Sequence, residues 1–122
     1  MTPADELSAL YRQWRHLTEA ESQAIRSNAW AQVEAAQSAK ARLQPRIAEV
    51  SAALAPVAHE QRFYAVVEEL IQLEQGNREL IQAQRQVAQH QKEQLDQTSR
   101  NLRQLHRSYA PPAVRAHWQS YS

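Results

Sequence analysis

Residues 63 to 109 follow one helical pattern, and this pattern constrains the fold more than any other feature of the chain. Apolar side chains recur there at three- and four-residue steps, the period of one face of an α-helix. At about 1.5 Å per residue, such a helix spans on the order of 70 Å, more than one compact domain of this size. The stripe is dense at first, with Phe63, Val66, Val67, Leu70, Leu73, Leu80 and Ile81, and then thin, with Val87, Leu95, Leu102, Leu105 and Tyr109.

The composition predicts an all-α fold. Ala, Gln, Leu, Arg and Glu, which are good helix formers, dominate the 122 residues, and no run of strand length alternates with period two. Phosphate-cradling and dinucleotide-binding loops depend on several glycines, and the chain has only Gly76. Nucleotide-binding folds of those types are therefore excluded. Within the long helix, Gly76 either bends the helix or allows another helix to approach closely.

We predict one helical domain, an elongated antiparallel up-down bundle or coiled coil whose N-terminal hairpin packs on one long C-terminal helix. Thr2 is expected to cap the first helix, with Pro3 at its first position. Asn28 is expected to cap the second helix, and Pro45 to kink or break it. The expected segments are helix one over 1–27, kinked helix two over 28–55, the long helix over 58–109 and a tail over 110–122.

Two charged residues occupy positions of the helical seam where hydrocarbon is expected. Glu21 lies in the seam of the first helix and Lys40 in that of the second. A buried charge is costly unless a partner matches it. Either the two side chains pair across the hairpin, or each extends its charged end to solvent from the edge of the seam.

The sequence predicts neither an enzyme nor a cofactor or metal site. No two of the five histidines share the i, i+4 spacing of a helical metal site, and the chain has no cysteine. Glu68 and Glu69 are adjacent and project in different directions, and no glycine-rich oxyanion loop accompanies any serine. The net charge is +1. With no targeting or membrane-spanning pattern visible, we expect a cytoplasmic protein without a membrane partner.

Basic residues gather near the end of the long helix. Arg100, Arg103, Arg107 and Arg115 follow Asp96 without a further acidic residue. They form either a solvated face favoured by the helix dipole or a small site for an acidic partner or a nucleic acid backbone. Because four arginines are a small electrostatic footprint, we expect no nucleic-acid partner.

The thin end of the stripe is the candidate partner-binding surface. Helix-in-groove binding uses apolar anchors at three- or four-residue steps with polar flanks. Alternatively, these residues pack on the first helix or close a homodimer. The candidate residues are Leu95, Leu102, Leu105 and Tyr109, with Val114 and Trp118 in the tail.

The order of these signals resembles the FlgN-like flagellar export chaperones. The segment LTEAESQAIRSNAWAQV, a lysine ten residues after Trp30, and the segment ELIQLEQGNRELIQAQ carry the resemblance. Glu21, the break from Asn28 to Trp30, and Lys40 stand at the matching places in the hairpin. In the long helix the matching residues are Leu73, Asn77, Leu80 and Ile81. Pro45 and the pair Pro111 and Pro112 depart from the family pattern.

The resemblance implies a small cytosolic helical chaperone. Members hold the C-terminal helical segments of hook-filament junction subunits and deliver them to the flagellar type III export apparatus. The cargo surface of the family corresponds here to about 95–118. The alternative function is a structural coiled-coil module that homo-oligomerises without a cargo.

Overall fold

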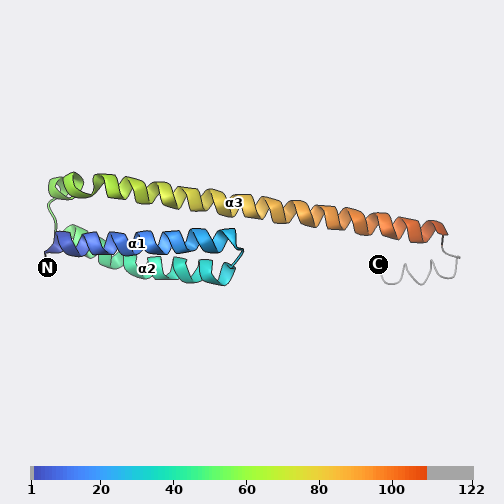
Figure 1. Ribbon diagram of the computed structural model, residues 1–122, viewed down its shortest axis with the longest axis horizontal. Coiled ribbons are helices and arrows are strands. Elements are labelled where there is room, and N and C mark those ends of the chain that lie inside the picture. Colours follow the sequence, from blue (N-terminus) through green and yellow to red (C-terminus); the bar gives the residue numbers. More distant parts are fainter. Residues whose placement is uncertain (1, 110–122) are drawn as a thin grey trace. The chain divides into compact units, whose positions relative to one another are not determined.

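The computed structural model describes residues 2–109, which contain three α-helices and no β-strand (Figure 1). The all-α prediction is confirmed. Each predicted helix has a counterpart. At the majority of the helix ends, the observed boundary lies two or three residues from the expected one. The helices are α1 (Pro3–Arg26), α2 (Trp30–Ala52) and α3 (Pro56–Tyr109).

Thr2 caps α1 as its residue type and place predict. Its hydroxyl accepts a hydrogen bond from the backbone N–H of Asp5 at 3.1 Å, and its own N–H donates to the Asp5 carboxylate at 3.4 Å. This arrangement is a capping box, in which two backbone N–H groups that have no partner inside the helix are hydrogen-bonded. Pro3 follows at the start of the helix, where a missing N–H removes no bond.

The turn between α1 and α2 corrects the role predicted for Asn28. The residue before α2 is Ala29, which makes no side-chain capping bond. Asn28 instead has φ of 57°, and the N–H groups of Asn28 and Ala29 donate back to the carbonyls of Ile25 and Ala24. This pair of bonds is a Schellman motif, which ends a helix with one left-handed residue. Asn28 therefore terminates α1, because asparagine tolerates the left-handed conformation better than most residues.

The prolines of the hairpin have different effects. α2 continues through Pro45, so this proline does not break the helix. Pro56 is the first residue of α3, which therefore begins two residues earlier than the predicted position 58. A proline at this place is preorganised for the helix by its fixed φ.

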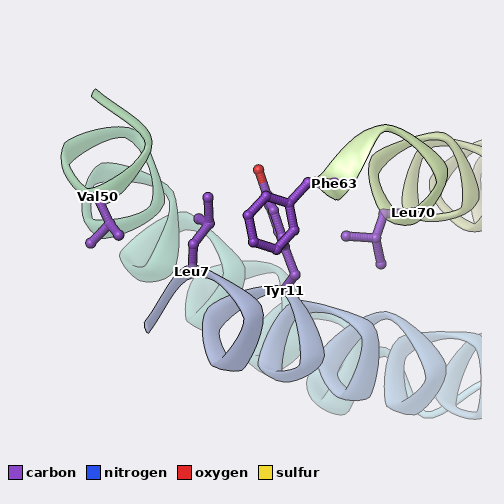
Figure 2. Packing of buried hydrophobic residues seen from close by; sticks show 5 residues of the cluster. All are labelled: Leu7, Tyr11, Val50, Phe63 and Leu70. Carbon is purple, nitrogen blue, oxygen red and sulfur yellow. The ribbon is translucent and has the colours of Figure 1, made fainter. Parts of the chain in front are cut away.

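Residues Met1–Gln84 form one compact unit, in which the start of α3 packs against the hairpin of α1 and α2. Figure 2 shows the side chains of Leu7, Tyr11, Val50, Phe63 and Leu70, which come from all three helices. The Tyr11 and Phe63 rings meet edge to face, with their centroids 5.4 Å apart. A second cluster at the other end of the hairpin is made of Ala24, Ile25 and Val33, with Ala29, Leu80 and Ile81 against it. The predicted packing of the N-terminal hairpin on the long helix is confirmed.

Residues Arg85–Ser122 form the second unit. Its described part is the continuation of α3, and every residue from 85 to 108 is exposed. This part of α3 therefore buries no side chain among the described residues.

Gly76 lies in α3 within the first unit. A Cβ placed on it would have no neighbouring atom within 4 Å. Of the two alternatives for this glycine, close approach of another helix is therefore wrong.

Candidate partner-binding surfaces

Three leucines of α3 form an exposed stripe in the second unit. Leu95 is 68% exposed, Leu102 55% and Leu105 53%. We call these three residues the late stripe. Tyr109 is the last residue of α3, but its side chain, together with Val114 and Trp118, lies outside the part of the chain that is described.

Polar side chains of this segment contact one another along the surface of α3. Arg100 donates to Gln97 at 2.9 Å, and Gln97 donates to Asn101 at 3.1 Å. Such contacts join side chains three or four residues apart on the helix surface. The late stripe therefore lies on a helix that also exposes many polar side chains, as helix-in-groove binding uses.

The first unit has an apolar groove that the sequence alone did not reveal. It has a volume of about 380 Å³, is open to solvent and is lined by side chains of α1, α2 and α3. We call it the α2–α3 groove. The side chains that line it are Tyr11 and Trp14 of α1, Gln44 and Ile47 of α2, and Val67, Leu70, Ile71, Glu74, Gln75 and Arg78 of α3.

The groove continues along α3 into a more polar cavity of about 330 Å³. Trp14, Gln44, Glu74 and Arg78 line both cavities, and Ile81 extends the lining by another turn of α3. The side of α3 that faces the groove is therefore apolar at both ends and charged in the middle.

A buried lysine joins all three helices beside the groove. The Lys40 ammonium lies 3.1 Å from a carboxylate oxygen of Glu21 and 2.6 Å from one of Glu74. Glu21 and Lys40 are 3% and 5% exposed, so their charges have little contact with water. Of the two alternatives for these seam residues, the structure shows the pair across the hairpin, and it adds a third charge that the sequence did not indicate.

Neutral groups complete this network. Asn77 donates to Glu21 at 2.8 Å and to the carbonyl of Thr18 at 2.9 Å. The Thr18 hydroxyl and the Trp14 indole N–H both reach Glu74, at 3.0 and 3.1 Å. No buried side-chain nitrogen or oxygen lacks a hydrogen-bond partner in the described part of the chain. The network thus fixes the position of α3 against the hairpin without leaving a polar group unsatisfied.

A surface ion pair strengthens the same contact. The two terminal guanidinium nitrogens of Arg15 donate hydrogen bonds to the carboxylate of Glu69, at 2.5 and 2.7 Å. These hydrogen bonds lower the pKa of Glu69 and raise the pKa of Arg15. Fork-shaped pairing of this kind fixes orientation as well as charge. Because both side chains are solvated, we regard the pair as a guide to register more than as a source of stability.

No three His, Asp or Glu side chains gather as metal ligands between residues 2 and 109. His59 faces the core, where its ring lies 2.9 Å from the Tyr11 hydroxyl. Over the same range, no helix has the length and apolar character needed to cross a membrane.

Comparison of the chain with family models, with curated proteins and with solved structures finds no match. The two surfaces therefore rest on the sequence and the geometry alone.

The groove has a sequence signal that becomes readable once the fold is known. Val67, Glu74 and Ile81 are seven residues apart, and Leu95 and Leu102 continue the same series after Ala88. A seven-residue repeat marks one side of a long helix that packs against another helix. In the sequence, Val67 and Ile81 stand out only as part of the dense apolar stripe, and Glu74 does not stand out, because no local pattern shows which side of α3 stays open.

Proposed function

We propose that the protein is a cytosolic export chaperone of the FlgN-like type. It binds the amphipathic C-terminal helices of hook-filament junction subunits before their export, and the late stripe is its cargo surface. The observation that carries the proposal is the exposure of Leu95, Leu102 and Leu105 on a polar-flanked helix.

The physical basis is the apolar surface of these leucines. Full burial of one leucine side chain contributes about 1.5–3 kcal/mol. Three leucines on one face can therefore give a cargo helix useful affinity after the cost of ordering the partner is subtracted. The same contact would cover the apolar face of the cargo and prevent its premature association.

The residues that carry the family resemblance have a different role from the cargo surface. Glu21, Lys40 and Asn77 belong to the buried network, and Leu80 and Ile81 pack on the second cluster. These residues support the proposal because all of them contribute to the contact between the hairpin and α3. Cargo contacts are expected from the other unit.

The test is binding of a synthetic peptide from the C-terminal helical segment of a hook-filament junction subunit, measured by fluorescence anisotropy. Leu102→Asp and a chain truncated after Gln94 are expected to lose at least tenfold in affinity. Val57→Asp is the matched control, because Val57 is also an exposed aliphatic residue of α3 but lies far from the late stripe in sequence. Undiminished binding by the truncated chain would show that the cargo surface lies elsewhere.

A coiled-coil module without cargo is the second candidate, favoured by the spacing of the late stripe. Leu95 and Leu102 are seven residues apart and Leu105 follows after three, as in a heptad seam. A scaffold of this kind predicts an oligomer that persists in sedimentation with the cargo peptide in excess. Dissociation of the oligomer when the cargo peptide is added would support the chaperone function instead.

A further inference from the structure

We propose that, without cargo, the late stripe of one copy of this chain lies in the α2–α3 groove of a second copy, in an antiparallel dimer with two-fold symmetry. In this dimer the second copy fills the groove and also covers the late stripe. It rests on the proposed function in one respect only, namely that a cargo helix displaces the second copy.

The two surfaces match in length and spacing. The groove side of α3 runs from Val67 through Glu74 to Ile81, and the corresponding positions of the second unit run from Leu95 through Leu102 to Tyr109. Both stretches therefore advance by two seven-residue steps, a rise of about 21 Å along a helix. A helix of the second unit is thus as long as the groove that it would fill.

The charges of α3 favour antiparallel pairing. Residues 56–84 contain five acidic and two basic side chains, a net charge of −3. Residues 85–109 contain five basic and two acidic side chains, a net charge of +3. Two antiparallel copies place each acidic segment beside a basic one, whereas two parallel copies place like charges together. Complementary potentials of this kind set orientation and disfavour the wrong arrangement.

The ends of the two surfaces match in apolar character, whereas Leu102 at the centre of the stripe faces the charged middle of the groove at Glu74. Trp14, Ile47 and Leu70 line the groove, and Ile71 stands exposed at its edge. An open apolar groove and a row of exposed leucines both leave hydrocarbon in contact with water, which is unfavourable. One contact would remove both surfaces from water.

A second copy is the occupant that completes both surfaces. Each copy brings one groove and one stripe, so two copies satisfy all four surfaces by a single symmetric interface. In this arrangement each groove and each late stripe is covered once, so the dimer is closed.

The symmetry fixes the register. With the two stretches aligned in opposite directions, Ile81 lies opposite Leu95 of the second copy. The centre of the interface then falls at Ala88, which meets its own equivalent. Ala83, five residues earlier, is also exposed but lies on a different side of α3.

The first test uses a thiol at the symmetry centre. The chain has no cysteine, so Ala88→Cys and the control Ala83→Cys each introduce a single thiol. Treated with a short bis-maleimide, the Ala88→Cys protein is expected to give mostly covalent dimer and the Ala83→Cys protein at least fivefold less. Equal cross-linking of the two, or none, would overturn the proposal. Circular dichroism checks that both remain helical.

The second test separates stripe-in-groove contact from a coiled coil of two late stripes. Leu102→Asp and Ile71→Asp damage the stripe and the groove respectively, and each variant alone is expected to sediment as a monomer. Mixed, they should regain a dimer, because the intact stripe of one fits the intact groove of the other. A dimer that survives Ile71→Asp, or a mixture that stays monomeric, would overturn the proposal. So would a wild-type chain that is monomeric at all concentrations.

The third test distinguishes failure of this proposal from failure of the proposed function. Excess cargo peptide is expected to reduce cross-linking of the Ala88→Cys protein at least fivefold. Peptide binding by a chain that never cross-links would contradict the dimer and leave the chaperone intact. Cross-linking that peptide does not reduce, in a chain that fails to bind peptide, would contradict the chaperone and leave the dimer intact.

Discussion

Lys40 is a buried charge that joins all three helices. Its ammonium group contacts carboxylates from α1 and α3 while sitting on α2, and its nitrogen also lies 5.4 Å from the centre of the Trp14 ring. Replacing such a group by hydrocarbon together with its partners is often tolerated, whereas removing only one partner leaves a buried charge without compensation. The network is therefore a sensitive point of the fold.

The Lys40→Met variant tests this point. It is expected to lower the free energy of unfolding by about 3–5 kcal/mol, because the buried carboxylate of Glu21 keeps only the neutral amide of Asn77. Urea unfolding followed by circular dichroism measures the change. Lys92→Met is the matched control, since Lys92 is exposed, and should change stability by no more than about 0.5 kcal/mol. A loss below about 1 kcal/mol in Lys40→Met would contradict a stabilising role for the lysine.

Among the elements, α3 combines two environments in one helix. Its residues up to Gln84 contribute Phe63, Leu70 and Asn77 to the buried interior, whereas those from Arg85 to Ser108 bury nothing. Helical propensity is nevertheless maintained through the second part by its many glutamines and arginines. The element is therefore specified by propensity along its whole length and by packing only over its first half.

Gly76 offers a test of propensity inside the packed half. Because a Cβ at this position would meet no atom within 4 Å, Gly76→Ala is free of steric cost. The substitution is expected to raise the free energy of unfolding by about 0.5–1 kcal/mol, since alanine loses less backbone entropy in a helix. Thermal and urea unfolding measure the effect. A destabilised variant would mean that α3 needs the glycine for a bend.

At the scale of the whole molecule, the two units differ in what they bury and what they expose. All buried side chains of the described chain belong to the unit that ends at Gln84, and the exposed late stripe belongs to the other. A protein whose binding surface adds nothing to its own core can change partners without unfolding. This division suits a chaperone that must both hold and release a cargo.

Truncation at the unit boundary tests the division. A chain ending at Gln84 is expected to unfold cooperatively, with a free energy of unfolding within about 0.5 kcal/mol of the full chain, because residues 85–108 bury no side chain. The comparison is made by urea unfolding at a concentration where sedimentation shows both chains to be monomeric. Loss of the cooperative transition would show that the second unit supports the first.

The sequence by itself determined the helices of this protein. Propensity, capping by Thr2 and helix ends near the prolines are local effects, so they can be read from neighbouring residues. The seam spacing also identified Glu21 and Lys40 as charges that must either pair or reach solvent. What the sequence misjudged was the turn at Asn28, because asparagine favours both the start of a helix and the left-handed residue after one.

Only the tertiary structure decided which of these residues meet. Glu74 completes the lysine network from 34 positions away, and the α2–α3 groove is lined by side chains that all three helices bring together. Contacts between distant segments depend on how the helices pack together, which no local pattern encodes. The late stripe was visible in the sequence as a row of leucines, but its exposure depends on what the remainder of the chain leaves uncovered.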